Sequence, residues 1–420
     1  MNRYASFAGR LLPILLGVWI LGACSESAPA PSPPSRPTLR LGSDRLFEEP
    51  YLGWIQGKSV GLIANHTALN SRLEAVAGVL TSRPGIKVKA IFSPEHGFSG
   101  DVQAGVLVPH QSRVYSLYGA HRSPTAEMLR GVDLLIYDIQ DVGVRFYTYI
   151  STLYECMKAA AREGIPLVVL DRPNPIDGDR VEGPLLDTSL ISFVGVHPLP
   201  IRYGMTVGEL ARLFNHEGEL ECDLRVVPMQ GWHRSRWFDE TGLVWVPPSP
   251  NMPTLTTATL YPGFCLVEGT NLSEGRGTTR PFQLVGAPWL DAPRLAESLN
   301  SLGLAGVYFR VQSFTPTFSK FKGQICRGVQ IHIVDRNRFD PISCVLHFLR
   351  QTLDLHPGEL EFQDQMFDRL AGQPGLRTDL LQGVPVEQAV SSWRSGLESF
   401  RERRARHLLY PQDDGIWKER

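Results

Sequence analysis

The chain has 420 residues, of which 43% are hydrophobic and 20% are charged. This balance is typical of a folded protein with enough apolar mass for two or three domains, and it excludes a disordered chain. The formal net charge at pH 7 is −1, so no strong basic field is present, and nucleic acid is not expected as a partner.

The amino terminus has the pattern of an export signal. Within residues 1–24, two arginines precede an apolar run that is too short for a comfortable membrane span. The run ends in Leu-Gly-Ala-Cys, which resembles a bacterial lipobox with Cys24 as the lipidated residue; a simple cleaved signal peptide is the alternative. Serine follows Cys24, which favours the outer membrane over the inner one. Residues 25–38 are rich in proline and serine and predict a tether, so we expect folding to begin near Leu39.

The remaining cysteines do not form a disulfide pattern. Their number is odd, their spacings are long, and most lie inside apolar segments, which favours buried free thiols. They are Cys156, Cys222, Cys265, Cys326 and Cys344.

Strand and helix patterns then alternate along the first half of the chain. Apolar runs predict strands at 60–64, 86–93, 132–138, 165–170 and 223–229. Helices are predicted over 71–83, 123–131, 148–164 and 206–218; the first and last carry the capping boxes Ser71–Glu74 and Thr206–Glu209, and Ser123 caps the second. The pattern predicts a Rossmann-like parallel sheet covered on both faces, over residues 39–263.

The pattern of predicted strands and helices changes after a proline-dense stretch. Residues 246–263 predict a long irregular loop. Beyond it, we expect a smaller α+β domain over 264–420. Its predicted elements are helices at 292–303, 342–353 and 385–410 and strands at 306–314 and 328–336.

Polar residues follow the predicted strands. In parallel sheets, ligands bind outside the carboxyl ends of the strands, so these clusters predict a binding or catalytic crevice. The residues concerned are Asn65, His66, Glu95, His96, Asp138, Asp141, Asp171, Arg172 and Asn174.

The sequence lacks the motifs of several common enzyme classes. No GxGxxG follows the first strand, no P-loop lysine is present, and there is no GxSxG elbow or HExxH pair. A metal held by His66, His96, Asp138 and Asp141 is the weaker alternative, because no spacing fixes its geometry. We therefore expect no cofactor.

What remains is carboxylates, arginines and aromatic rings in glycine- and proline-rich loops. Hydrolysis of a glycosidic bond needs one carboxyl that donates a proton and usually a second group at the anomeric carbon. Glu95, partly shielded at a strand end, suits the acid role, and Glu268 and Glu274 are candidates for the second. Arg172 and Arg276 are able to hold a carboxylate bidentately. A surface ion pair is the alternative for each glutamate, and the protein core is the alternative for the tyrosines of "GVRFYTY".

Six stretches in order resemble the NamZ-type exo-β-N-acetylmuramidases. They are "SPEHGFSGD", "LIYDIQDVGVRFYTYISTL", "VLDRPNPIDGDRVEGPLLD", "PIRYGMTVGELA", "VPPSPNMPTLTTATLYPG" and "EGTNLSEGRGTTRPF". The resemblance implies removal of N-acetylmuramic acid from the non-reducing end of peptidoglycan fragments, in cell-wall turnover and recycling. It also implies a Rossmann-like domain and a smaller domain with the active site in the cleft between them.

The resemblance also implies roles for single residues. Glu95 in the PEHG motif is the expected general acid, with Glu268 as its partner and Glu274 as the less favoured one; if the substrate acetamido group is the nucleophile, Glu268 or Asp138 orients it. The expected substrate-binding set is Asn65, His66, His96, Asp138, Arg145, Tyr147, Tyr149, Arg172, Asn174, Asn251, Asn271 and Arg276. The rival hypotheses are a non-catalytic muropeptide-binding lipoprotein and an amidase or deacetylase acting on the same fragments.

Overall fold

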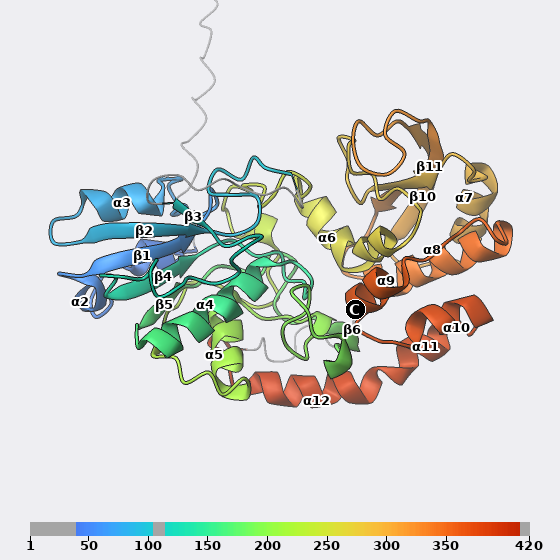
Figure 1. Cartoon of the computed structure of the whole chain (residues 1–420). Helices are drawn as coiled ribbons and strands as arrows, with labels where there is room; N and C mark the ends of the chain where they lie inside the picture. The colour runs from blue at the N-terminus through green and yellow to red at the C-terminus, as the bar shows by residue number, and fades with distance from the viewer. Residues whose placement is uncertain (1–38, 104–113, 412–420) are drawn as a thin grey trace, which may run out of the picture. The chain divides into compact units, whose positions relative to one another are not determined.

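The computed structural model describes residues 39–103 and 114–411, so the predicted signal sequence, the tether and Cys24 lie outside the described residues. In the first half of the chain, six parallel strands form one sheet (Figure 1). They are β1 (Ser59–Ala64), β2 (Lys87–Ser93), β3 (Val114–Ser116), β4 (Leu134–Asp138), β5 (Leu167–Leu170) and β8 (Leu224–Val227). Their order in the sheet, β3-β2-β1-β4-β5-β8, is the doubly wound order of Rossmann folds and confirms the predicted class.

Successive side chains of each strand point to opposite faces of the sheet, and each face packs into its own apolar core. Val60 and Leu62 of β1 pack with Leu46, which follows the short helix α1 (Gly42–Arg45), and with the helices α2 (Leu52–Ile55) and α3 (Val76–Ser82). Ile63 of the same strand packs on the other face, with α4 (Tyr149–Glu163) and α5 (Val207–Glu217). Figure 1 shows α3 on one side of the sheet and α4 and α5 on the other. The near-continuous apolar strands therefore reflect burial on both faces.

Of the helices predicted in this half, one begins later than predicted and one does not form. Helix α3 begins only at Val76, because the Ser71 hydroxyl donates to Asp44 (2.9 Å) and the Glu74 carboxylate accepts from the Asn70 amide (2.7 Å). Residues 123–131 form turns and no helix, because a short helix needs tertiary contacts that capping residues do not replace. The Thr206–Glu209 capping box of α5 is confirmed.

The proline-dense stretch is an irregular loop only in its first part. Thr254 caps helix α6 (Leu255–Phe264), which runs directly into the 3₁₀ helix η3 (Cys265–Gly269). Nearly all of α6 is buried, so its apolar residues are not confined to one face and it lacks the one-sided periodicity that predicts a surface helix. Pro262 stands in its last turn.

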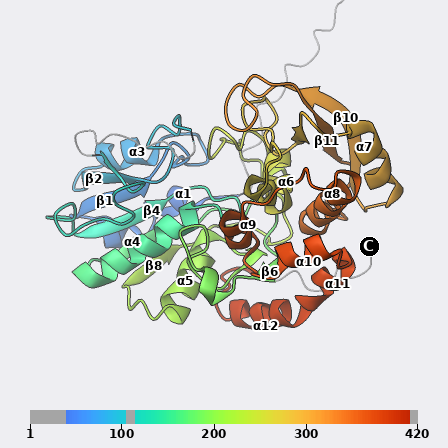
Figure 2. The same cartoon turned by 45° about the vertical axis from the view of Figure 1, so that its right-hand side comes forward.

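The rest of the chain forms the smaller α+β part (Figure 2). Strands β9 (Leu284–Ala287), β10 (Val307–Phe314) and β11 (Cys326–Ile333) form an antiparallel sheet in the order β10-β11-β9, with α7 (Ala292–Ser301) and α8 (Pro341–Leu355) packed against it. The predicted helix over 385–410 is two helices that meet at Trp393. The remaining helices are α9 (Asp364–Ala371), α10 (Leu376–Gln382), α11 (Val386–Ser392) and α12 (Arg394–Ala405).

Two short strands and two 3₁₀ turns complete the described elements. Strands β6 (Glu182–Leu185) and β7 (Pro200–Arg202) pair antiparallel, and the turns are η1 (Thr188–Leu190) and η2 (Phe238–Glu240). The five cysteines after Cys24 are free and buried, which confirms their prediction. Among the described helices, none has the length and apolar character needed to cross a bilayer.

The end of the described chain returns to the first sheet. The Tyr410 hydroxyl donates to Oδ2 of Asp171 (2.5 Å) and accepts from the amide of Met229 (2.8 Å). Burial raises the pKa of Asp171 to about 7, although the donation from Tyr410 lowers it. Asp171, predicted from its strand-end position to belong to the crevice, therefore holds the carboxyl-terminal segment in place.

Candidate active site

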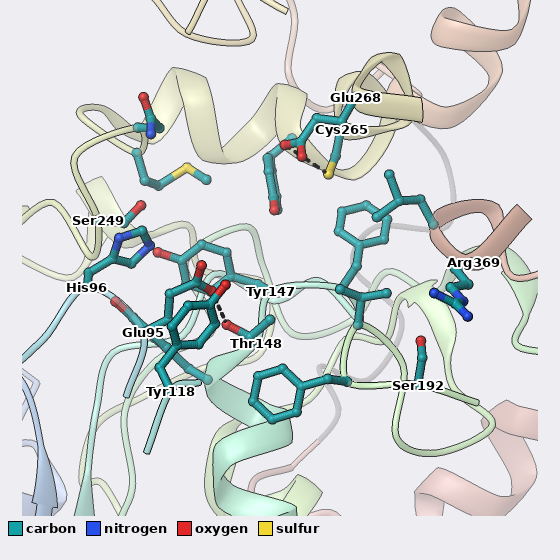
Figure 3. Close-up of a pocket in the computed structure, with 18 of the residues that line it drawn as sticks. Glu95, His96, Tyr118, Tyr147, Thr148, Ser192, Ser249, Cys265, Glu268 and Arg369 are labelled. Carbon is teal, nitrogen blue, oxygen red and sulfur yellow. Dashed lines mark hydrogen bonds between the residues drawn. The ribbon is translucent and has the colours of Figure 1, made fainter. Parts of the chain in front are cut away.

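A pocket of about 670 Å³ brings together loops that follow the parallel strands and segments of the second half of the chain. The first half contributes residues after β2, β3 and β4, and the second half contributes α6, η3 and α9. Figure 3 shows Glu95 and Glu268 on opposite walls of this pocket. Seven predicted site residues line it, namely Glu95, His96, Tyr147, Tyr149, Asn251, Glu268 and Arg276.

Glu95 is held by hydroxyl groups from two other segments. It follows β2 after Pro94, and its Oε2 accepts a hydrogen bond of 2.8 Å from the hydroxyl of Thr148, at the start of α4. The Tyr118 hydroxyl, after β3, also hydrogen-bonds Glu95; burial and the charge of Glu95 raise the pKa of Tyr118 to about 12. The carboxyl group of Glu95 is thus fixed in the pocket by two neutral donors.

His96 stands beside this carboxyl group with an unusual backbone. Its φ is +73°, a left-handed conformation that costs a residue with a Cβ about 1 kcal/mol or more. Its Nδ1 lies 2.6 Å from the carbonyl oxygen of Val102, so that nitrogen carries a proton. Burial lowers the pKa of His96, while the charge of Glu95 opposes the shift. A neutral imidazole therefore lies next to Glu95 near pH 7.

Two tyrosines of the "GVRFYTY" motif form part of the pocket wall. The rings of Tyr147 and Tyr149 meet edge to face with centroids 4.8 Å apart. The Tyr149 hydroxyl donates to the carbonyl of Pro248 (2.6 Å), and the amide of Asn251 donates to Oε1 of Gln103 (3.0 Å). These contacts fix the wall that continues from Glu95.

Glu268 lies in η3, within a network of charges. Arg276 donates to its Oε1 (2.7 Å), and the Cys265 thiol lies 3.6 Å from the same oxygen. Nε of Arg276 lies 3.4 Å from Glu274, whose other oxygen lies 3.2 Å from Nζ of Lys320. Burial opposes the charge of Arg276, but Glu268 and then Glu274 raise the pKa of Arg276 above its ordinary value. The arginine therefore stays cationic, and Glu274, only 2% exposed, does not line the pocket.

The glycines around Arg276 have positive φ, +78° at Gly275 and +80° at Gly277. The close approach that they permit is to protein backbone: a Cβ at Gly277 would lie 2.6 Å from the carbonyl oxygen of Phe318. This contact fixes the direction in which Arg276 leaves the loop.

The two predicted arginines Arg172 and Arg145 do not line the pocket. Nε of Arg172 donates to Oδ1 of Asp138 (2.6 Å) in a buried ion pair, and burial raises the pKa of Asp138 while Arg172 opposes that shift. Arg145 is 1% exposed and donates to the carbonyls of Pro184, Leu199 and Leu370 (3.0, 3.0 and 2.7 Å). Burial lowers the pKa of Arg145 to about 9.

Four further predicted residues also support loops outside the pocket lining. Asn65 accepts from the amide of Thr67, His66 contacts Pro247, Asn174 donates to Met205, and Asn271 donates to Glu359, at 2.9, 2.7, 3.0 and 2.7 Å. Substrate binding by these residues stays a prediction, because their described contacts are structural. Within the described ranges, no three His, Cys, Asp or Glu side chains gather as metal ligands.

The sequence did not single out several residues of the pocket. These include Tyr118, Arg122, Thr148, Ser192, Phe193 and Arg369. Thr148 lies between the two predicted tyrosines, so the same motif contained the signal for it. Arg369 lies in α9, where no motif points to a site.

Family models match almost the whole described chain. Residues 60–256 match the model described as "Exo-beta-N-acetylmuramidase NamZ, N-terminal", and residues 259–410 match its C-terminal counterpart. The chain belongs to the NamZ exo-β-N-acetylmuramidase family. Glu95 falls in the first matched region and Glu268 in the second, so the pocket joins both regions of a NamZ-family chain.

Relatives of this NamZ-family chain agree in sequence and in fold. It is 44% identical over 411 residues to the "Peptidoglycan beta-N-acetylmuramidase NamZ" of Bacillus subtilis (strain 168), covering 95% of this chain and 99% of that protein. Two crystal structures of DUF1343 family proteins from Bacteroides fragilis are also similar. One is 37% identical with a TM-score of 0.83, covering 90% of this chain and 100% of that one; the other is 30% identical with a TM-score of 0.71, covering 89% and 99%.

Proposed function

We propose that this protein is an exo-acting glycosidase that hydrolyses the β-linkage of N-acetylmuramic acid at the non-reducing end of peptidoglycan fragments. One observation carries the proposal: Glu95 and Glu268 face each other across one pocket in a chain that belongs to the NamZ family. Two carboxyl groups on either side of a bond are the arrangement that glycoside hydrolysis uses.

In this proposal, Glu95 is the general acid. It gives its proton to the glycosidic oxygen as the bond to the anomeric carbon breaks, and the leaving sugar departs with a free hydroxyl. Thr148 and Tyr118 hold the carboxyl group in one orientation, which keeps its proton directed at a single position in the pocket.

Glu268 acts on the other side of the reacting carbon. Arg276 holds the Glu268 side chain in place, so that its oxygens accept a hydrogen bond from the attacking water or from the N–H of the substrate acetamido group. Glu274 serves to hold Arg276 and Lys320. The anomeric form of the first product, read by NMR, separates direct attack of water from participation of the acetamido group, because the former inverts and the latter retains configuration.

We further propose that the protein is exported and anchored by a lipid at Cys24, in the outer membrane, and that it acts in cell-wall turnover and recycling. The Leu-Gly-Ala-Cys sequence and the proline- and serine-rich stretch after it support the anchor. Incorporation of a labelled fatty acid into the full chain, lost in Cys24→Ala, tests it; an unlabelled wild-type chain would contradict it.

The hydrolase proposal is tested with a chromogenic β-N-acetylmuramide and with the N-acetylmuramic acid–N-acetylglucosamine disaccharide. We expect release of free N-acetylmuramic acid, reduced at least 1,000-fold in Glu95→Gln and unchanged in Glu74→Gln, a control at a half-exposed glutamate outside the pocket. Saturable binding of both substrates without any cleavage would instead support the rival hypothesis of a muropeptide-binding protein.

A further inference from the structure

N-acetylmuramic acid differs from N-acetylglucosamine by a lactyl ether that ends in a carboxylate. An enzyme that selects the former needs a cation at the place where that carboxylate lies. Three arginines line the pocket, namely Arg122, Arg276 and Arg369. Their contacts differ, and the difference decides which of them is available to a ligand.

Arg276 is already neutralised by the protein. Its guanidinium donates to Glu268 at 2.7 Å and lies 3.4 Å from Glu274, so two carboxylates surround one cation. A third carboxylate would add more repulsion than attraction at this position. Arg276, which the sequence offered together with Arg172 as a clamp for a carboxylate, is therefore a positioning residue for Glu268.

Arg122 interacts both with Phe193 and with Tyr118, the residue that hydrogen-bonds Glu95. Its guanidinium carbon stands 4.6 Å from the ring centroid of Phe193, in a cation–π contact. Burial and Glu95 raise the pKa of Tyr118, and the charge of Arg122 opposes that rise. A substrate carboxylate bound at Arg122 would lie beside Tyr118, which hydrogen-bonds Glu95. Its negative charge would oppose the ionisation of Glu95 that accompanies proton donation.

The side chain of Arg369 is available to a ligand in the part of the chain that the structure describes. It is exposed, it stands in the last turn of α9, and within the described ranges its guanidinium has no hydrogen bond or ion pair. Figure 3 shows it across the pocket from Glu95, on the same side as Ser192. The Ser192 hydroxyl oxygen is buried and has no hydrogen-bond partner in the described structure.

Backbone contacts hold these two residues in one neighbourhood. The amide of Asp187, at the start of the segment that leads to Ser192, donates to the carbonyl of Gly372, the residue that caps α9 (2.8 Å). Arg145 donates to Leu370, directly after Arg369 (2.7 Å). The end of α9 is thus fixed against the segment that carries the unpaired hydroxyl.

We infer that Arg369, assisted by the Ser192 hydroxyl, binds the lactyl carboxylate of N-acetylmuramic acid and makes the pocket selective for it over N-acetylglucosamine. This inference rests on the proposed function. The guanidinium donates to the carboxylate oxygens, and the serine hydroxyl donates to one of them. Both donors lie away from Glu95, so the substrate charge is bound without disturbing the acid.

The test compares charged and neutral ligands. Inhibition constants are measured against a chromogenic β-N-acetylmuramide for free N-acetylmuramic acid, its lactyl N-methylamide and N-acetylglucosamine. In the wild-type protein, we expect the acid to bind roughly 10- to 100-fold more tightly than the neutral amide, as for a charge-assisted hydrogen-bonded pair. In Arg369→Gln this ratio should fall close to one, and Arg369→Lys should restore part of it.

Arg122→Gln is the matched control, because it removes another arginine of the same pocket; there the ratio should stay as in the wild type. A wild-type ratio in Arg369→Gln, or a ratio of one in Arg122→Gln, would overturn the inference. N-acetylmuramoyl-L-alanine forms a third arm, because its carboxylate lies on the peptide. If only that ligand depends on Arg369, the recognised group belongs to the peptide stem and the lactyl assignment fails.

Different results would contradict the hydrolase function and the carboxylate site at Arg369. A wild-type protein that never cleaves the β-muramide contradicts the proposed function, and the three ligands are then compared by calorimetry. A wild-type protein that cleaves it, with an unchanged ratio in Arg369→Gln, contradicts only the inference. Circular dichroism and melting temperature verify that each variant is folded, as expected for substitution of an exposed side chain.

Discussion

The hydroxyl of Thr148 donates a hydrogen bond of 2.8 Å to Oε2 of Glu95. The two residues are distant in sequence, one at the start of α4 and the other after β2, and the parallel sheet brings them together because the carboxyl ends of neighbouring strands meet at one edge. The proposed acid is therefore oriented by the fold and not by its own loop alone.

We predict that Thr148→Val and Tyr118→Phe each lower kcat roughly 10-fold and change KM little. Each removes one hydrogen bond to Glu95, worth about 1.4 kcal/mol of orientation in the transition state. Steady-state kinetics on a chromogenic β-muramide measure the effect. Thr81→Val, which removes an exposed hydroxyl on α3, should behave as the wild type; an equal loss there would point to a general effect on folding.

Glu268 and Glu274 should have different roles, one in catalysis and the other in stability. Glu268 lines the pocket, whereas Glu274 is buried between Arg276 and Lys320. We predict that Glu268→Gln lowers kcat at least 100-fold with a nearly unchanged melting temperature. Glu274→Gln should instead lower stability by about 2 to 4 kcal/mol, because it removes a buried carboxylate that pairs with two partly buried cations. The reverse pattern in kinetics and thermal melting would exchange their assigned roles.

Gly277 should not tolerate a side chain. At φ +80°, alanine there meets the Phe318 carbonyl at 2.6 Å, so we predict a loss of about 3 kcal/mol in the free energy of unfolding and a loss of activity through Arg276. Gly303→Ala is the control, because its φ is +63° and nothing lies within 4 Å of the added Cβ. It should cost only about 1 kcal/mol in urea denaturation. Equal losses in the two variants would show that backbone conformation alone matters.

Stability should depend on pH through Asp171. Burial raises the pKa of Asp171 to about 7 in the folded state, against about 3.9 in an unfolded chain. Between these values the folded state binds the extra proton, so the contribution of this group to stability falls as pH rises from about 4 to 7. The difference in unfolding free energy between the wild type and Asp171→Asn should therefore change steadily over that range, to the disadvantage of the wild type at higher pH. Asp187 is exposed, and the difference in unfolding free energy between the wild type and Asp187→Asn should not change over that range.

The fold was largely predictable because burial on both faces leaves an unambiguous pattern. The runs that became β1 and β4 are apolar throughout and end at polar residues, as central parallel strands do. Helix α6 was not predictable from periodicity, since it is buried on all sides and carries a proline. The 123–131 segment shows the opposite error, because good capping residues do not replace tertiary contacts.

The candidate site was predictable only in part. Glu95 and Glu268 stood out because they lie in glycine- and proline-rich motifs at element ends. Arg172 did not differ in sequence from an arginine that faces a ligand, and only the structure shows its buried partner Asp138. Arg369 lies on an ordinary helical pattern, so the sequence gives no signal that its side chain is unpaired.

Arg145 lies outside the pocket, yet it joins both halves of the chain around one cation. Its guanidinium holds the carbonyls of Pro184 and Leu199 from the first half and of Leu370 from the second. Because Leu370 directly follows Arg369, this non-covalent cross-link ties the helix that carries the proposed carboxylate site to the first half of the chain. A cation outside the pocket lining thus connects two of the segments that build the pocket.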